Sequence, residues 1–167
     1  MAAIIGVELV HLHPMDGGAF LGFHALSKFL APRFGATLGD GLSQSAPITV
    51  GNLLLLGKGS MDLSTQANKI ENIAADMADG DLKLKNQTNM KVAVVENRTV
   101  TPKVNVDGLK TKSTDIKMDA GKKLTVAGNL RSTDDTKIEA DDLDLGNNKV
   151  NVGNQLTLEK ANKAQTI

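Results

Sequence analysis

Residues 120–130 read AGKKLTVAGNL, and residues 136–145 read TKIEADDLDL. Both stretches contain triplets of an apolar, a polar and a second apolar residue, set apart by Gly, Asn, Asp or Lys. Alternation with a period of two is typical of short strands that bury one face. The pattern begins at Ile48 and recurs along the chain in the pairs Ile48/Val50, Met61/Leu63, Leu82/Leu84, Val92/Val94, Val104/Val106, Ile116/Met118, Leu124/Val126, Leu143/Leu145, Val150/Val152 and Leu156/Leu158.

The same apolar residues return at a longer interval of roughly 20 residues, which is in the range of repeat proteins. Two interleaved series with this period indicate at least two strands per repeat, as in a coil of a β-helix. The sequence therefore predicts an all-β fold, a right-handed parallel β-helix in which one chain forms a β-solenoid of about 20 residues per coil. One series is Met61, Leu82, Val104, Leu124 and Leu143, and the other is Ile73, Val92, Ile116, Ile138 and Leu156.

The aromatic content agrees with this fold. The chain has no Trp or Tyr, and no Phe follows Phe34. A narrow coil has room inside for Val, Ile, Leu and Met but little room for aromatic rings, whereas a β-sandwich uses such rings to fill a wider core.

We expect three parts along the chain: residues 1–46 as an N-terminal cap, 47–160 as solenoid repeats and 161–167 as a C-terminal tail. Within the cap, apolar residues recur at helical spacing over residues 19–31, and Pro32 follows, which predicts a short amphipathic helix. The helix either covers the open end of the solenoid or forms an interface for self-association. Its apolar residues are Phe20, Phe23, Leu26 and Leu30.

Charge and composition narrow the functional classes. The 19 basic and 19 acidic residues cancel, so bulk charge gives no reason to expect binding to nucleic acid or to an anionic membrane. No apolar stretch is long enough to predict a transmembrane helix, and Met1–Val10 lacks the basic start of a secretory signal. The absence of Cys fits a cytosolic protein and equally a large bacterial secreted protein.

Two sets of side chains could bind a metal. His11, His13 and Asp16, with His24, could form a metal site, and the alternative is a partly buried pair of histidines near a turn. Acidic turns offer oxygen ligands for calcium, but Asp also favours turns on its own and the glycine-rich calcium repeat is missing. We interpret both sets as structural and predict no metal and no cofactor. The acidic turns contain Asp76, Asp79, Asp81, Asp134, Asp135, Asp141, Asp142 and Asp144.

The sequence predicts no catalytic site and no enzyme. All His residues precede the repeats, Cys is absent, and no nucleophile or phosphate-binding motif occurs. A carbohydrate-active β-helix would line its groove with aromatics and Arg, but only Arg98 and Arg131 lie in the repeats. The glycosylation sequons at Asn86 and Asn97 are attributed to the high Asn and Thr content.

Residues 120–130, 136–140 and 142–146 together resemble the repeats of filamentous haemagglutinin-type exoproteins of bacterial two-partner secretion. Those repeats form coils of a right-handed parallel β-helix. The resemblance extends over about residues 62–158. It implies an adhesin-like or scaffold module at the cell surface or outside the cell, with a host-cell or surface protein or glycan as its ligand.

Residues 68–79, NKIENIAADMAD, resemble the neck segments of trimeric autotransporters, which would distribute the coils over three chains. Bactofilin-type cytoskeletal β-helices are a third comparison and imply a cytoplasmic location. The second functional hypothesis is therefore a self-assembling structural protein, either a filament or a trimeric fibre.

Overall fold

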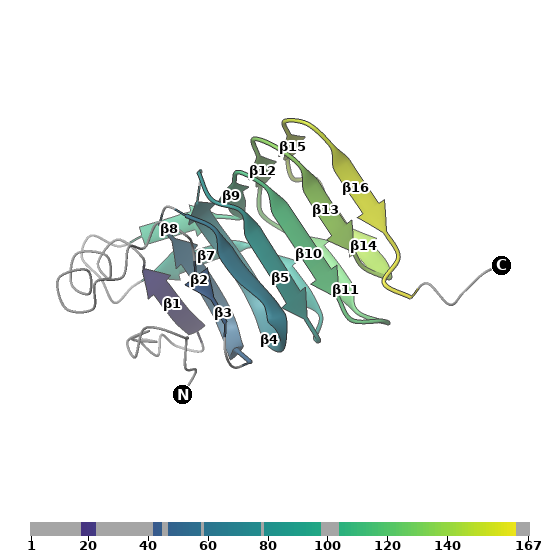
Figure 1. Ribbon diagram of the computed structural model, residues 1–167, viewed down its shortest axis with the longest axis horizontal. Coiled ribbons are helices and arrows are strands. Elements are labelled where there is room, and N and C mark those ends of the chain that lie inside the picture. Colours follow the sequence, from purple (N-terminus) through teal and green to yellow (C-terminus); the bar gives the residue numbers. More distant parts are fainter. Residues whose placement is uncertain are drawn as a thin grey trace.

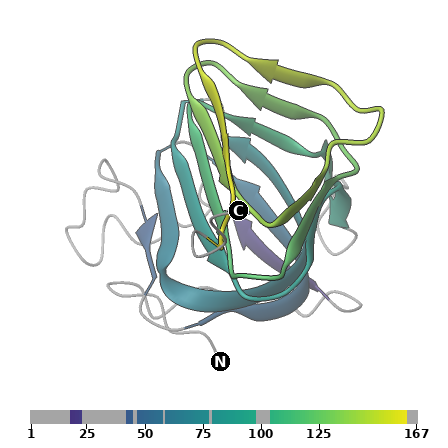
Figure 2. The same cartoon turned by 90° about the vertical axis from the view of Figure 1, so that its right-hand side faces the viewer.

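The computed structural model describes residues 18–22, 42–44, 47–57, 59–77, 79–97 and 104–162. Every regular element in these ranges is a strand. Parallel strands stack into a β-solenoid of about 5 turns with roughly 21 residues per coil (Figure 1). Seen from the C-terminal end in Figure 2, the chain turns counter-clockwise as it approaches the viewer, so the solenoid is right-handed. The predicted fold class is confirmed.

Each coil contributes strands to three sides of the solenoid. The first side stacks β2 (Leu42–Ser43), the start of β4 (Met61–Met77), β5 (Leu82–Asn86), β10 (Thr114–Met118), β13 (Thr136–Glu139) and β16 (Leu156–Glu159). The second side stacks β3 (Thr49–Leu56), β4, β6 (Met90–Val92), β11 (Lys123–Val126) and β14 (Asp142–Asp144). The third side stacks the end of β4, β9 (Leu109–Thr111), β12 (Leu130–Ser132) and β15 (Val150–Val152).

The core is a set of columns in which like side chains from successive coils lie directly above one another. Leu63, Leu84, Ile116 and Ile138 occupy one column in register and are buried, and Leu158 follows them at the end. Burying a large aliphatic side chain stabilises a fold by about 1.5–3 kcal/mol, and adjacent coils supply both the burial and the backbone hydrogen bonds. A single coil has neither, so the coils depend on one another.

The period of the repeat was predicted correctly, but the membership of the two series was wrong. Met61 does pair with Leu82, yet the next residues in that column are Thr114 and Thr136. Leu124 instead lies on the second side, between Met90 and Leu143.

The second series also mixes two sides of the solenoid. Ile73 pairs with Val92 on the second side, whereas Ile116 pairs with Ile138 on the first. Leu156 stacks on Thr136 and not on Ile138. An insertion after Val92, described below, shifts the numbering between the coils of Val92 and Ile116 and explains that part of the error.

The predicted helix over residues 19–31 is wrong at its start. Residues 19–22 belong to β1 (Gly18–Gly22), which pairs in parallel with β3 from Gly18 opposite Asn52 to Gly22 opposite Leu56. A strand forms there because residues 18–22 pair with the edge of β3, and this tertiary pairing outweighs the local helical spacing of the apolar residues. The remaining helix positions, with Phe23, Leu26 and Leu30, lie outside the described residues, and parallel stacking extends into the predicted cap through β1 and β2.

Two buried asparagines tie successive coils together at the corner between the first and second sides. The side chain of Asn68 accepts a hydrogen bond from the Ile48 backbone N–H at 2.8 Å and donates to the Lys85 carbonyl at 3.0 Å. One coil later, Asn86 accepts from the Ile70 N–H at 2.8 Å. Buried polar side chains are tolerated only when hydrogen-bonded, and these amides replace the backbone partners that a sheet lacks at a corner.

Candidate binding surface

A β-hairpin interrupts the regular coil between β6 and β9. Its strands, β7 (Val94–Asn97) and β8 (Val104–Asp107), pair antiparallel, and residues 98–103 between them lie outside the described residues. The Gly108 N–H donates to the Ala93 carbonyl at 3.1 Å, which closes the base of the hairpin. The Ala93 N–H donates to the Ile73 carbonyl, and the Ala75 N–H donates to the Gly108 carbonyl. The backbone hydrogen bonds to β4 therefore continue on both sides of the hairpin.

Glycine is required where the hairpin rejoins the coil. Gly108 has a φ of 76°, in the left-handed region that favours glycine. A Cβ at this position would lie 1.8 Å from the carbonyl oxygen of Asn129 in the next coil. The backbone of β9 can therefore stack on β12 only with Gly at residue 108.

An apolar contact fixes the hairpin against the outer face of the solenoid. Leu54 and Ala74 face outward from β3 and β4, yet both are fully buried because Val95 of β7 packs over them. Leu56 and Val106 complete this small second core. Outward positions of a solenoid are normally polar, so these apolar residues indicate that the hairpin packs specifically against this face.

A groove of about 200 Å³ lies between the foot of the hairpin and the third side of the solenoid. Three of its lining residues, Asp76, Lys110 and Arg131, stand in one outward column because β4, β9 and β12 pair in register. The full lining is Asp76, Asn105, Val106, Asp107, Leu109, Lys110, Asn129 and Arg131.

The charges in this groove are unequally matched. Lys110 Nζ lies 3.2 Å from Asp76 Oδ1, so that pair neutralises itself. Asp107 accepts hydrogen bonds from the backbone and side-chain amides of Asn129. Within the described part of the chain, the exposed Arg131 has no carboxylate at ion-pair distance. Among the described residues, the groove therefore presents one guanidinium without an ion-pair partner, beside the Asp76–Lys110 ion pair and the Asp107 carboxylate, which is hydrogen-bonded to neutral amides.

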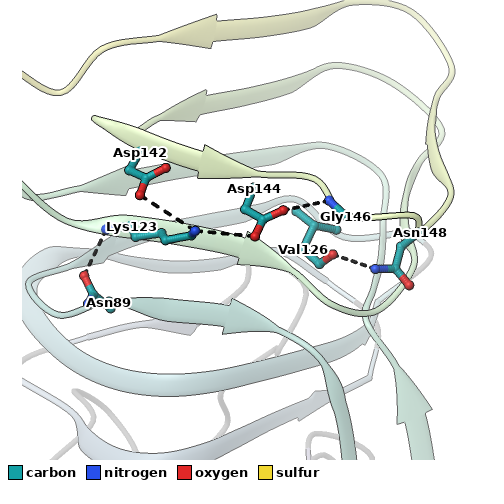
Figure 3. Close-up of polar contacts among 7 residues, drawn as sticks. All are labelled: Asn89, Lys123, Val126, Asp142, Asp144, Gly146 and Asn148. Atoms are coloured by element: carbon teal, nitrogen blue, oxygen red, sulfur yellow. Dashed lines mark hydrogen bonds and ion pairs between the residues drawn. The ribbon is translucent and has the colours of Figure 1, made fainter.

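A second groove, of about 530 Å³, crosses the outer face of β4, β6 and β11 and includes Glu71, Lys91 and Lys123. Figure 3 shows that Lys123 bridges Asp142 and Asp144 of the next coil, at 3.8 and 3.4 Å from its Nζ. These exposed ion pairs are worth at most about 1 kcal/mol each, but they hold the lysine within the coil stack.

Most of the acidic turns that were candidate calcium ligands bind protein groups instead. Asp81 accepts a hydrogen bond from the Ser113 hydroxyl at 2.7 Å, and Asp135 accepts one from the Asn154 side chain at 2.7 Å. The described residues contain no group of three or more His, Cys, Asp or Glu placed to hold a metal ion. The histidine candidates His11, His13 and His24 lie outside the described residues, as does Asp16.

Asp141 shows how such a turn joins two coils. One carboxylate oxygen accepts the Gly121 N–H at 2.6 Å, and the other accepts the Asn162 N–H at 2.7 Å. The hydrogen bond from Gly121, followed by that from Asn162, lowers the pKa of Asp141 below its ordinary value of 3.8. The carboxylate thus works in its charged form as a clamp between neighbouring coils.

The sequon asparagine at residue 86 is a core residue. Its Nδ2 donates to the carbonyls of Ile70 at 3.0 Å and Thr88 at 2.8 Å. A glycan at this nitrogen would require Asn86 to leave the core. Asn97, the other sequon residue, ends β7, and its side chain is not described.

Sequence reasoning missed the hairpin and its groove, including the place of Arg131 in it. One signal was present: the pairs Val92/Val94 and Val104/Val106 are spaced more closely than one coil, and Val95 breaks the alternation.

No family model matches the chain, and no curated protein or solved structure matches it significantly. The resemblance to filamentous haemagglutinin-type repeats therefore stays a prediction. None of the described segments is a helix of the length and apolarity needed to cross a membrane.

Proposed function

We propose that this chain is a non-enzymatic, adhesin-like scaffold module of a bacterial surface or secreted exoprotein, in which the solenoid presents the hairpin face to a surface protein or glycan. The observation that carries the proposal is the hairpin, which is anchored over Leu54 and Ala74 and borders a groove on the third side. Insertions into solenoid repeats gather on one face, and this face is often the binding face. A site supported by stacked strands is also held more rigidly than one on free loops.

Arg131 gives the expected ligand its chemistry. A guanidinium binds carboxylate or sulfate groups with two parallel hydrogen bonds, and Arg131 is available for such a contact. Lys110 is less suited to this role because Asp76 already neutralises it. A ligand that carries acidic groups, such as an acidic glycan, fits this face better than a neutral one.

The proposed location is the cell surface or the outside of the cell. It rests on the resemblance of residues 120–146 to exoprotein repeats and on the solenoid fold that this resemblance implies. A cytoplasmic location, as in bactofilin-type filaments, is the alternative.

Binding to immobilised heparin, hyaluronan and neutral dextran, measured by biolayer interferometry, tests the proposal. We expect binding to the acidic polysaccharides that weakens with added salt, and no binding to dextran. Arg131→Gln should weaken this binding about tenfold, which corresponds to losing about 1.4 kcal/mol. Lys91→Gln is the matched control, because Lys91 is exposed on the second side, away from the hairpin groove.

Equal binding by the wild type and Arg131→Gln would show that the groove is not the site. Binding to none of the polysaccharides would contradict an acidic-glycan ligand. Depolymerisation of heparin or hyaluronan by the protein would contradict the non-enzymatic assignment.

A further inference from the structure

The C-terminal end of the solenoid is apolar and uncovered in the described residues. In β16, the side chains of Leu156 and Leu158 point to the inside of the solenoid but are 40% and 48% exposed. Thr136 and Ile138, directly beneath them in β13, are 0% and 1% exposed. The difference arises because β16 is the last strand of its sheet, at the right-hand end of the stack in Figure 1.

The backbone of β16 also offers an open edge. The N–H of Thr136 donates to the Gln155 carbonyl at 2.8 Å, and the N–H of Ala140 donates to the Glu159 carbonyl at 3.0 Å. Because hydrogen-bonding direction alternates along a strand, residues 155, 157 and 159 face β13. The N–H and C=O groups of Leu156 and Leu158 therefore point away from the stack.

The described part of this edge has no Pro, no inward-pointing charge and no bulge, three features that prevent edge-to-edge pairing in other sheets. β16 reads LTLE, with leucines at both inward positions.

We propose that β16 pairs antiparallel with β16 of a second copy, about a two-fold axis that passes through Thr157. In this register Leu156 of one copy lies opposite Leu158 of the other, and both leucines keep their side chains on the inner face. The backbone N–H and C=O groups of Leu156 and Leu158, which point away from β13, then bond to those of the other copy. Leu156 of one copy and Leu158 of the other therefore form a hydrogen-bonded pair. The two cores become continuous through four leucines that are otherwise half-exposed.

Charge is compatible with this register. Glu159 of one copy lies opposite Gln155 of the other, and Thr157 lies opposite itself, so no like charges face each other across the interface. Glu159 also keeps its own ion pair with Lys137, at 3.3 Å within one copy. The interface is isologous and closed, which gives a dimer and does not propagate into a filament. The association does not depend on the ligand proposed for the hairpin face.

A cysteine cross-link tests the register directly, since the chain contains no Cys. Thr157 forms the non-hydrogen-bonded pair at the axis, where Cα atoms lie about 4.5 Å apart, within the range of a disulfide. Thr157→Cys should give a covalent dimer under mild oxidation. Asn151→Cys, on the outer face of β15 in the preceding coil, is the matched control and should stay monomeric on a non-reducing gel.

Sedimentation velocity over a range of concentrations provides the second test. The wild type should form dimers, and Thr157→Asp should raise the dissociation constant at least tenfold, because it sets two carboxylates opposite each other. Within one copy the new carboxylate lies beside Lys137, so the monomer keeps its fold, as circular dichroism would verify. Mixing Thr157→Asp with Thr157→Lys should restore association.

A wild-type protein that stays monomeric at all concentrations would overturn the proposal, as would a trimer or a growing filament. Dimers that Thr157→Asp leaves unchanged, or equal cross-linking at residues 151 and 157, would place the interface elsewhere. Binding to acidic polysaccharides by a strictly monomeric protein would refute this dimer and leave the proposed ligand intact.

Discussion

The side chain of Asn86 accepts a hydrogen bond from the backbone N–H of Ile70 at 2.8 Å and donates one to the carbonyl of the same residue at 3.0 Å. The side-chain amide thereby takes the place of a neighbouring strand's backbone at the corner of the coil, where Ile70 no longer lies in the sheet that contains Asn86. One side chain satisfies both backbone groups of a residue in the preceding coil. Corners of this solenoid are therefore held by specific polar side chains and not by burial alone.

Asn86→Ala should lower the free energy of unfolding by about 2–4 kcal/mol, since it leaves several buried backbone groups without partners. Urea unfolding followed by circular dichroism measures this loss. Asn151→Ala, at an exposed position of β15, should change the unfolding free energy by less than about 0.5 kcal/mol. A similar small effect at Asn86 would show that water replaces its hydrogen bonds.

The anchoring of the hairpin gives a prediction about local opening. Val95→Ser removes the side chain that covers Leu54 and Ala74, so the hairpin should detach while the solenoid stays folded. Hydrogen exchange should become at least tenfold faster in β7 and β8 and remain unchanged in β10 and β13. Val94→Ser is the control, because Val94 is 53% exposed and faces away from this contact. Faster exchange throughout the protein would mean that the hairpin is part of one cooperative unit.

The clamp at Asp141 predicts a pH dependence. Its folded-state pKa lies below 3.8, so its stabilising contribution is fully present well above pH 3.8 and is lost as the pH falls through the folded-state value. Asp141→Asn places an amide N–H₂ against the N–H of Gly121 or of Asn162. The melting temperature of this variant should therefore fall below that of the wild type at pH 7, and the difference should shrink below about pH 4.

Asp79→Asn controls for the loss of one charge, because Asp79 is an exposed turn residue and accepts none of the hydrogen bonds described above. This variant should melt close to the wild type at both pH values. A difference for Asp141→Asn that persists unchanged below pH 3 would assign its effect to packing and not to the carboxylate.

The period and the fold class followed from the sequence because each coil repeats the same physical requirement. Most strands have aliphatic residues inside and polar residues outside, and this requirement appears locally as triplets such as Leu124-Thr125-Val126. The register did not follow, because it depends on which triplets share a side of the coil. The triplet at Val104 has the same pattern but belongs to the hairpin, and counting through it joined residues of different sides of the solenoid into one series.

The candidate site was less accessible to sequence reasoning than the fold. Arg131 was noted only as one of two arginines in the repeats, since its position beside Lys110 depends on a register that the inserted hairpin hides. The acidic turns raised a metal hypothesis, although Asp81 and Asp141 accept hydrogen bonds from neighbouring coils. A turn carboxylate has the same sequence signature whether it binds a metal, solvent or a backbone N–H.

A pair of buried hydroxyls provides the last prediction. Thr111 and Thr114 face each other inside the coil with their Oγ1 atoms 2.7 Å apart, at positions where the preceding coil has Met77 and Leu82. Thr111→Val leaves the Thr114 hydroxyl buried without this partner and should cost about 1–3 kcal/mol, and Thr114→Val should cost about as much. The double variant removes both polar groups and keeps the volume, so it should lie within about 1 kcal/mol of the wild type. Urea unfolding of all four proteins measures the coupling, and costs that simply add would show that the two hydroxyls do not depend on each other.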